Sequence, residues 1–416
     1  MKKNYFFILL LLFSLFQAQI VNIPDANFKA KLLSANTSNG IAKNSNGQNI
    51  ILDANSNGEI ETTEALNVYR LEFYSSNISN ITGITNFTNL THLKMGFIDA
   101  TTVNLNGLNN LQVIDMSNFN ALSTLNISNF SNLQSFKITY SFNLNTLTLQ
   151  NLPVLSQLTI NTNSSLNNLT ISNFPVLAVI NCTSNNALTN LIIQNCSAVT
   201  SLDLGNNSLS TLQLNTLPLL QNLVLNHNEL TTLDVANFSN LQSLSAVGNF
   251  LTSADLNANP LLHTVYLSEN QLQNVKIKNG GQNFPSTFHI FNNTPFQYLC
   301  CDAEDIAIAT SKINQQGYTS VIVDSSCAVT PPILSVAETP GKSGQVSFYP
   351  NPVNEVLFIK SDEKVVKTEI YDSAGRVIMT TGIKDNSLNV SPLSKGNYII
   401  KIYFKDKTAT QKFIKI

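Results

Sequence analysis

One short pattern, repeated at a nearly constant interval, restricts what this chain can fold into more than any other feature. The pattern is Leu-x-x-Leu-x-Leu-x-x-Asn, and successive copies start 22, 21, 22, 22, 22, 22, 21, 21, 21 and 23 residues apart. Its first position falls at Val68, Leu90, Leu111, Leu133, Leu155, Leu177, Val199, Leu220, Leu241, Leu262 and Pro285. A unit of this length cannot bury its apolar face alone, so the units must stack into a solenoid with one continuous core.

Each unit contains a second copy of the same pattern about 11 residues after the first. Clear examples begin at Leu122, Leu144, Leu188 and Leu230. In both copies the closing Leu-x-Leu alternates with the period of a β-strand. We therefore predict a mostly β solenoid of about eleven coils, with extended segments on both sides of each coil and little or no α-helix.

The Asn position of the pattern holds an amide in seven successive units. These residues are Asn163, Asn185, Asn207, Asn228, Asn249, Asn270 and Asn293. An inward amide has two donors and an acceptor, which can satisfy the turn backbone of its own coil and the next. Earlier units have Ile98, Phe119 and Ser141 at this position, so we expect a less regular stack there.

The matching position of the second copy forms an apolar column. It contains Phe130, Leu152, Phe174, Cys196, Leu217 and Phe238. Cys196 replaces a larger apolar residue in this column, and Cys182 takes the third apolar position of its strand. We interpret both as small buried hydrophobic residues. A metal or redox role is the alternative, but no second Cys or His stands at a metal-binding spacing.

The repeat over residues 66–296 resembles the leucine-rich-repeat family, in the nested form found in bacterial surface proteins. The resemblance implies a curved solenoid whose short parallel strands line one face. We assign residues 68–296 to the solenoid, residues 19–67 to an N-terminal cap and residues 297–329 to a C-terminal cap. In the N-terminal cap we predict a short helix over residues 23–33, with Pro24 at an early helical position and Asp25 in the first turn.

The segment DANSNGEIETTE, residues 53–64, matches a twelve-residue calcium loop and resembles the loop of EF-hand and dockerin modules. The candidate ligands are Asp53, Asn55, Asn57, the carbonyl of Glu59, Glu61 through water, and Glu64. Two neutral ligands predict weak Ca²⁺ binding, on the order of 10⁻⁴–10⁻³ M, with a structural role in the cap. The alternative is an Asn- and Gly-rich loop that needs no metal.

In the C-terminal cap, Asp302 is positioned to cap a helix that runs to about Gln316, where Gly317 ends it. A strand over residues 319–323 should follow. We expect Cys327 to form a disulfide with Cys300 or Cys301, with a slight preference for Cys301.

A Pro-, Gly- and Ser-rich linker, residues 330–345, separates the caps from a tail over residues 346–416 that alternates like a small β-sandwich. Its motifs are Y-P-N-P, I-Y-D-x-x-G-R and L-x-x-G-x-Y, carried by Tyr349, Pro350, Asn351, Pro352, Tyr371, Asp372, Gly375, Arg376, Gly396 and Tyr398. We expect Gly375 and Gly396 at hairpins that need positive φ. The tail resembles the type A sorting domain of the Bacteroidetes type IX secretion system. That resemblance implies recognition by an outer-membrane translocon, removal by a sorting peptidase, and release or attachment to an anionic lipopolysaccharide.

Residues 1–18 have two lysines followed by a short apolar stretch, which predicts a cleaved signal peptide. Together with the tail, this predicts a protein secreted to the surface or surroundings of a Gram-negative bacterium. Residues 19–341 contain 9 Lys and Arg against 18 Asp and Glu, and residues 342–416 contain 12 against 7. Neither part has the dense positive charge that nucleic-acid binding requires.

Solvent-facing strand columns are the natural ligand surface of a solenoid. No Lys or Arg occurs between Lys137 and Lys276, and the low-charge face offers Asp203, Asp234, Asp255 and Tyr266 as candidate contacts. The four His residues occupy different places in the repeat, which argues against an active site. We expect a non-enzymatic module that binds a protein or glycan. The alternatives are a structural surface protein, an unrecognised hydrolase, and a water-ordering face whose columns Val179, Ile192 and Val224 interrupt.

Overall fold

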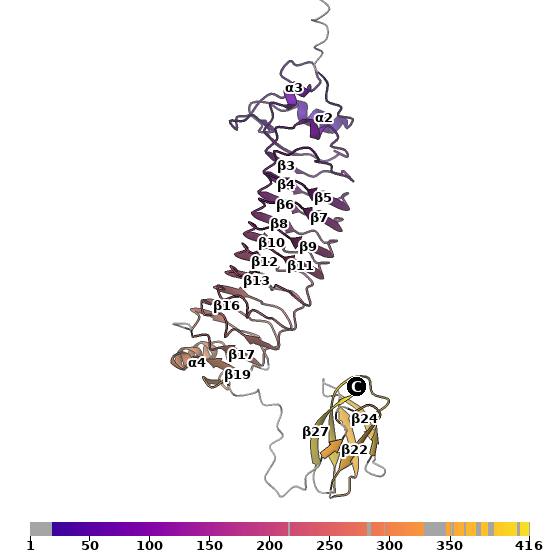
Figure 1. Ribbon diagram of the computed structural model, residues 1–416, viewed down its shortest axis with the longest axis vertical. Helices are drawn as coiled ribbons and strands as arrows, with labels where there is room; N and C mark the ends of the chain where they lie inside the picture. Colours follow the sequence, from indigo (N-terminus) through magenta and orange to yellow (C-terminus); the bar gives the residue numbers. More distant parts are fainter. Residues whose placement is uncertain are drawn as a thin grey trace, which may run out of the picture. The chain divides into compact units, whose positions relative to one another are not determined.

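The computed structural model describes residues 19–214, 217–280, 284–294, 296–327, 347–349, 351, 353–361, 363–371, 376–381, 387–405 and 408–415. The chain divides into two compact units, Met1–Pro331 and Pro332–Ile416. In the first unit the coils stack from helices α2 (Ala26–Leu33) and α3 (Thr62–Ala65) at one end to α4 (Ile306–Gln315) at the other (Figure 1). The expected signal peptide and linker lie outside the described residues.

The main sheet of the solenoid has twelve strands among the described residues, in the order β1-β2-β3-β4-β6-β8-β10-β12-β13-β14-β16-β18. Their bounds are β1 Ala42–Lys43, β2 Arg70–Tyr74, β3 His92–Gly96, β4 Val113–Ser117, β6 Ser135–Thr139, β8 Gln157–Asn161, β10 Val179–Asn181, β12 Ser201–Asp203, β13 Asn222–Val224, β14 Ser243–Ser245, β16 Thr264–Tyr266 and β18 Thr287–His289. β1 is antiparallel to β2, and every later pair is parallel. Strands β2 to β18 provide one strand per coil, which confirms the predicted solenoid of about eleven coils.

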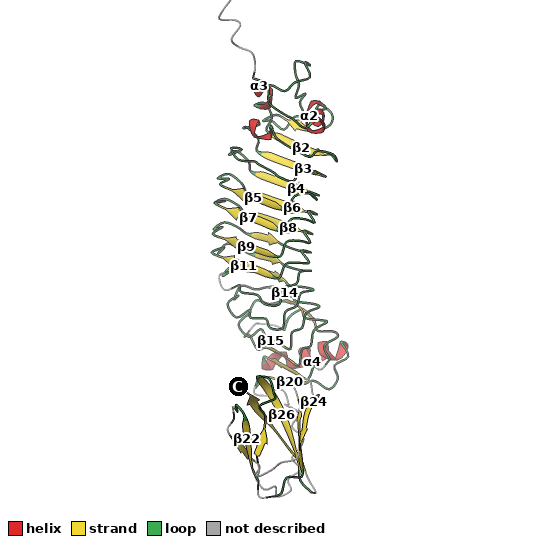
Figure 2. Ribbon diagram, turned by 90° about the vertical axis from the view of Figure 1, so that its right-hand side faces the viewer, coloured by secondary structure: helices red, strands yellow, loops and turns green. Residues whose placement is uncertain are grey.

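A second side of the solenoid has strands only in some coils (Figure 2). The four 22-residue coils that begin at Leu111, Leu133, Leu155 and Leu177 each have one: β5 Thr124–Ser128, β7 Thr146–Gln150, β9 Asn168–Ser172 and β11 Asn190–Gln194. At the C-terminal end, β15 Ser253–Asp255, β17 Asn274–Ile277, β19 Tyr298–Cys301 and β20 Ile322–Asp324 form a parallel sheet. In the 21-residue coils that begin at Leu90, Val199 and Leu220, the described part contains no second strand. The expectation of extended segments on both sides therefore holds for only part of the solenoid.

The two kinds of coil differ in the turn after the Asn position. In the 22-residue coils two residues separate Asn185 from Leu188, and the N–H of Leu188 donates to the carbonyl of Asn185 in the same coil (2.8 Å). The Asn185 Oδ1 is then available to the preceding coil, where it accepts from the N–H of Asn163 (2.9 Å). The amide Nδ2 of Asn185 donates to the carbonyl of Ile160 (2.7 Å), so a buried polar group is satisfied across two coils.

In the 21-residue coils only one residue separates the Asn from the next Leu, as in Asn228-Glu229-Leu230. The N–H of Leu230 donates to Oδ1 of Asn249 in the next coil (3.1 Å). Asn249 also donates through Nδ2 to the carbonyls of Leu225 (3.0 Å) and Ala246 (3.2 Å). The same side chain thus serves a different backbone donor in the shorter coil.

The expectation of a less regular stack around Ile98, Phe119 and Ser141 is wrong. Strands β3, β4 and β6 are five residues long and pair in register along their whole length. Ile98 and Phe119 are fully buried, so they extend the apolar core into the turn. The Ser141 hydroxyl takes the place of the amide and accepts from the N–H of Phe119 (3.2 Å).

The N-terminal cap is fixed to the first coil by Asp25. Its Oδ1 accepts from the N–H of Phe28 (2.9 Å), which makes it the N-cap of α2, and its Oδ2 accepts from the N–H of Ser79 (2.8 Å). The helix therefore begins at Ala26, and the predicted start with Pro24 inside the helix is wrong, because the Asp25 carboxylate satisfies the first free N–H groups. Phe28 is buried and its ring lies 5.5 Å from that of Phe73 on β2.

The C-terminal cap contains a 3₁₀ turn, Ala303–Asp305, followed by α4, and Gly317 adopts a φ of 92° just after the helix, as predicted. The expected side-chain cap by Asp302 is wrong, because the 3₁₀ turn separates Asp302 from α4 and its carboxylate accepts from the N–H of Gly280 (3.0 Å). β20 begins at Ile322, three residues later than expected. Side chains of the cap cover the edge strand of the main sheet: the Gln316 side chain accepts from the N–H of Ile290 and donates to the carbonyl of Phe288, both at 2.7 Å. This pairing removes an open edge that could recruit another strand.

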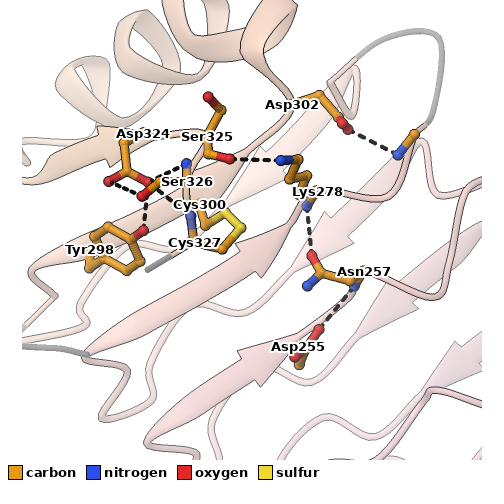
Figure 3. Close-up of a disulfide and its surroundings, with 11 residues drawn as sticks. Asp255, Asn257, Lys278, Tyr298, Cys300, Asp302, Asp324, Ser325, Ser326 and Cys327 are labelled. Atoms are coloured by element: carbon orange, nitrogen blue, oxygen red, sulfur yellow. Dashed lines mark hydrogen bonds between the residues drawn. A yellow bond between two sulfur atoms is a disulfide. The ribbon is translucent and has the colours of Figure 1, made fainter. Parts of the chain in front are cut away.

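The disulfide joins Cys300 to Cys327 (Figure 3), so the slight preference for Cys301 is wrong. Leu299 and Cys301 belong to the solenoid core, and Cys301 is a buried free thiol. Because side chains alternate along a strand, Tyr298 and Cys300 lie on the other face of β19. There the Tyr298 hydroxyl donates to Oδ1 of Asp324 (2.6 Å) beside the disulfide.

The second unit consists of two antiparallel sheets around one apolar core, in agreement with the predicted sandwich. One sheet contains β21 Ser347–Tyr349, β22 Val356–Lys360 and β25 Ser387–Asn389. The other contains β24 Val377–Thr381, β23 Lys367–Tyr371, β26 Gly396–Tyr403 and β27 Thr408–Lys415. Leu357 and Leu388 from the first sheet pack in the same core as Ile370, Ile400 and Phe413 from the second.

None of the helices in the described parts of the chain is both long enough and apolar enough to span a bilayer.

Candidate binding face and calcium-type loop

The outward side chains of the main sheet form columns, because successive strands pair in register one coil apart. The central column contains Glu72, Lys94, Asp115, Lys137, Thr159, Asn181, Asp203, Val224, Ser245, Tyr266 and His289. Its N-terminal end is charged, with Lys137 Nζ 3.2 Å from the Asp115 carboxylate. From Thr159 onward the column contains hydroxyl, amide and aromatic side chains and Val224, and Asp203 is the single charged residue in this part of the column.

The four residues predicted as binding contacts do not come together. Asp203 and Tyr266 lie on β12 and β16 of the main sheet, Asp255 lies on β15 of the second side, and Asp234 lies outside any strand. Each Asp accepts from the backbone N–H two residues later, in the pairs Asp203–Gly205 (3.0 Å), Asp234–Ala236 (3.0 Å) and Asp255–Asn257 (3.1 Å). All three carboxylates therefore stabilise Asx turns. Asp234 and Asp255 also lie outside the main sheet, so they are removed from the candidate face.

Tyr266 is part of an aromatic cluster that the sequence alone did not reveal. Its ring centroid lies 5.0 Å from that of His289, which lies 5.4 Å from that of Phe291. Repeat alignment could have found the first pair, since Tyr266 and His289 occupy the same position in adjacent coils. Phe291 follows two residues later, on the same outward side of the chain.

The calcium-type loop closes on its own side chains. The Asp53 carboxylate accepts from the N–H groups of Asn57 (3.1 Å) and Gly58 (3.0 Å), and Gly58 has a φ of 80° that favours glycine. The amide nitrogens of Asn55 and Asn57 donate to Glu61, at 3.2 and 2.6 Å. Their oxygens accept backbone N–H groups and each keeps a second lone pair.

Two residues of this loop, Glu61 and Glu64, have buried carboxyl groups. Glu64 accepts from the N–H of Ala54 (2.7 Å) and from the N–H of Glu61 (3.1 Å), so it fixes both ends of the loop. Burial raises the pKa of Glu64, and the hydrogen bond to Glu61 raises it further. The same bond lowers the pKa of Glu61, with help from Asn57. The hydrogen bond between the two carboxyl groups therefore favours the ionised form of Glu61 and the neutral form of Glu64.

Glu59 is directed away from this pair, because its carboxylate lies 2.6 Å from Lys29 Nζ on α2. Across the part of the chain that the structure describes, no three His, Cys, Asp or Glu side chains gather at one metal-binding point. A Ca²⁺ ion in this loop would thus depend on the Asn55 and Asn57 amide oxygens and the Glu59 carbonyl as well as on carboxylates. These are oxygen donors of the kind that Ca²⁺ accepts, so the residues fit a weak site.

The sorting motif contributes to the packing of the second unit. The Asn351 side chain accepts from the N–H of Ile414 (2.8 Å) and donates to the carbonyl of Lys412 (3.3 Å), which ties the Y-P-N-P motif to β27. The ring of Tyr398 stacks on Phe413 with 5.6 Å between centroids. Gly396 has the predicted positive φ, 158°, and is the first residue of β26.

Of the remaining motif residues, Tyr349 is exposed and stacks on Phe358, and Arg376 immediately precedes β24. Pro350, Pro352, Asp372 and Gly375 lie outside the described residues.

Tyr371 belongs to a polar network on the outer face of the second unit. The Glu369 carboxylate accepts from Lys367 Nζ (2.8 Å), from the Tyr371 hydroxyl (2.7 Å) and from the Tyr403 hydroxyl. The hydrogen bond from Lys367, followed by those from the two tyrosines, lowers the pKa of Glu369 to about 2. The spacing of Lys367, Glu369 and Tyr371 by two residues indicates one strand face, but the contribution of Tyr403 from β26 is visible only in the fold.

Residues 347–416 match the family described as the secretion system C-terminal sorting domain. The chain therefore has a type IX sorting domain, which directs it to the cell surface or the extracellular space and requires contact with the secretion machinery. No curated protein matches the chain.

Several solved structures are similar to this chain. An internalin (inlF) from Listeria monocytogenes is 17% identical with a TM-score of 0.36, over 74% of this chain and 92% of the internalin. A leucine-rich-repeat protein from Leptospira interrogans is 19% identical with a TM-score of 0.36, over 60% of this chain and 71% of the other. The functional domain of InlJ from Listeria monocytogenes is 16% identical with a TM-score of 0.20, over 96% and 98%. These scores are low, so the solenoid is assigned from this chain's own repeat and strand topology.

Proposed function

We propose that this chain is a cell-surface binding or adhesion protein that recognises a protein or glycan through the outward face of its main sheet, without catalysing a reaction. The observation that carries the proposal is the face itself. The outward side chains of eleven coils align in register, and from Thr159 to His289 the central column presents polar and aromatic groups with Asp203 as the one charged residue. Export by the sorting domain brings that face into contact with the surroundings of the cell.

The residues available for chemistry support a binding role. His92, His227, His263 and His289 lie in four different coils, and the Asp234 and Asp255 carboxylates are held in Asx turns on the second side. We propose that the translocon and a sorting peptidase are its export partners, and that attachment to an anionic lipopolysaccharide would retain it on the cell.

The test is binding of the full chain to protein and glycan arrays, alongside its retention on intact cells. Capture of a defined protein or glycan is expected. Retention on cells with no ligand on either array would replace the proposal with a structural surface role. Turnover of a polysaccharide or peptide substrate would show that the protein is an enzyme.

We also propose that the loop over residues 53–64 binds Ca²⁺ weakly and stabilises the N-terminal cap. The support is the pair of buried carboxyl groups, Glu61 and Glu64, beside the side-chain amides of Asn55 and Asn57, whose nitrogens donate to Glu61. When bound, the ion supplies positive charge that holds these oxygens together. Asp53 would be the first ligand, and Glu64 would close the loop from the start of α3.

Calcium titration of the melting temperature tests this second proposal. A rise in melting temperature over millimolar Ca²⁺ is expected, and Asp53→Asn should abolish it while keeping one carbonyl acceptor for the loop backbone. Glu59→Gln is the matched control, because the Glu59 carboxylate pairs with Lys29 and only its carbonyl is a ligand. An unchanged melting temperature in the parent chain up to several millimolar Ca²⁺ would reduce the loop to a turn that needs no metal.

A further inference from the structure

Three rings project from the last two coils of the main sheet. Tyr266 comes from β16 and His289 from β18, and their rings meet edge to face with an interplanar angle of 80°. Phe291, just beyond β18, meets His289 at 63°. The Phe291 side chain is 42% exposed, His289 is exposed and Tyr266 is half-buried.

The core does not require these rings. The inward positions of the same two coils are Val265, Leu267, Phe288 and Ile290, and all four are buried. Tyr266, His289 and Phe291 alternate with them and therefore face outward. In the preceding coils the place of Tyr266 is taken by Ser245 and Val224, so the fold accepts small side chains at this position. Three aromatic rings at exposed positions leave apolar surface uncovered without a structural need, which is typical of a binding site.

The neighbouring side chains favour an uncharged partner. Ser245, Thr264 and Thr287 line the adjacent outward strand positions and offer hydroxyl groups, and Glu269 in the turn after β16 is the nearest carboxylate along the chain. No Lys or Arg occurs over residues 138–275, and the Nζ of Lys312 on α4, which reaches the start of β18, donates to the carbonyl of Ser286 (2.7 Å). A protein partner would lose hydration of its own charges here and gain few opposite charges in return. A neutral sugar avoids this cost, because its C–H faces can lie on aromatic rings while its hydroxyl groups bond to Ser and Thr.

We propose that Tyr266, His289 and Phe291 form a platform that binds a neutral glycan at the C-terminal end of the main sheet. This inference rests on the binding function proposed above and adds the place and the ligand class.

The test measures retention of the full chain on insoluble cellulose, xylan, chitin and β-1,3-glucan, with an acidic polysaccharide and a protein array run in parallel. Tyr266→Ala and Phe291→Ala should each weaken retention on the preferred neutral polysaccharide about tenfold or more, the scale of an aromatic contact at the centre of a site. His289→Phe should keep most of the binding, since it keeps a ring. Phe250→Ala is the matched control, because Phe250 is 48% exposed and lies outside the cluster.

Melting temperatures of all variants should stay close to that of the parent chain, so a loss of retention cannot come from unfolding. Neutral-glycan binding that survives both Tyr266→Ala and Phe291→Ala would overturn the platform while leaving the binding function intact. Capture only by an acidic glycan or by a protein would overturn the ligand class in the same way. Capture by no polysaccharide and no protein would overturn the inference together with the proposed function.

Discussion

The four successive 22-residue coils that begin at Leu111, Leu133, Leu155 and Leu177 form the turn after the Asn position differently from the 21-residue coils that follow them. In the longer coils the Leu that opens the second half bonds to its own coil, as Leu188 does to Asn185, and the second half forms a strand. In the shorter coils that N–H depends on the next coil, as Leu230 does on Asn249. One residue in a turn therefore decides which N–H of the previous coil the amide oxygen accepts from: that of Asn163 where Asn185 is the acceptor, and that of Leu230 where Asn249 is the acceptor.

This difference divides the solenoid into two regions. On the second side, the longer coils form strands that are rich in Thr, Asn and Ser. In each of these coils the Leu N–H after the turn bonds to a carbonyl of the same coil. In the shorter coils the corresponding N–H bonds to the next coil, and these coils are followed by the aromatic cluster and the disulfide of the C-terminal cap. In a stacked array each coil is stabilised by its neighbours, so the shorter coils should be more sensitive to local changes.

The largest effect is expected from removal of the disulfide. Cys300→Ser with Cys327→Ser opens a loop of sequence separation 27, and loop-closure entropy predicts a loss of about 3.5 kcal/mol. Hydrogen exchange should accelerate in β15, β17, β19 and β20 and change little in β5, β7, β9 and β11. Reductant should reproduce this result in the parent chain and have no effect on the variant. Equal acceleration in all coils would contradict a locally stabilised C-terminal end.

Next in size is the replacement of the ladder amide by a hydroxyl. Ser141 already fulfils this role in a 22-residue coil, so Asn185→Ser should cost about 1 kcal/mol. Asn249→Ser should cost about 3 kcal/mol, because the hydroxyl is too short to satisfy Leu230 and the carbonyls of Leu225 and Ala246 together. Denaturant unfolding of the two variants measures the difference. Equal losses would show that the coil types do not differ in this respect.

A smaller effect concerns the left-handed residue before the ladder position. Thr162 has a φ of 59° in a longer coil, and Gly248 has a φ of 68° at the same place in a shorter one. A β-branched residue is strained there, so Thr162→Gly should stabilise by about 1 kcal/mol. Gly248→Thr should destabilise by about 1–2 kcal/mol, since a Cβ would also lie 2.4 Å from the His227 ring. Thermal melts that moved in the opposite directions would refute this account of the turn.

The smallest effect is a pH dependence at the N-terminal end. Burial raises the pKa of Asp25, but hydrogen bonds from Phe28, Ser79 and Asn80 outweigh it, and the pKa falls below 3.8. The stability from Asp25 is therefore complete above pH 3.8 and is lost as the pH falls through the lowered value. Between pH 5 and pH 2.5 the melting temperature of Asp25→Asn should fall less than that of the parent chain. Parallel pH profiles would contradict a role for the ionised carboxylate.

Much of this fold could be predicted because the repeat fixes which side chains face inward. The Leu-x-Leu alternation located eleven strands of the main sheet, and the conversion of Asn to Ser at position 141 was visible in the sequence. That the stack stays regular at Ser141 was not visible in the sequence, because this depends on whether the Ser141 hydroxyl can reach the Phe119 N–H one coil away. Alignment of Leu299 and Cys301 with Val275 and Ile277 could have assigned the disulfide to Cys300, since inward positions recur in register.

The candidate sites were harder to predict, because they depend on contacts between distant residues. Asp203 belongs to the first copy of the pattern and Asp234 and Asp255 to the second, so the sequence could assign them to different sides, whereas their use in Asx turns is visible only in the fold. The calcium loop was visible as a motif, whereas the opposite pKa shifts of Glu61 and Glu64 depend on burial and on the hydrogen bond between them in the fold.

Hydrogen exchange of the full chain, with and without the soluble oligosaccharide of the neutral polysaccharide that retains it best, tests the central claim most directly. We predict slower exchange in residues 264–292, around Tyr266 and His289, and no change in β5, β7, β9 and β11. Protection confined to those second-side strands, or to the sorting domain, would show that the main sheet is not the binding face.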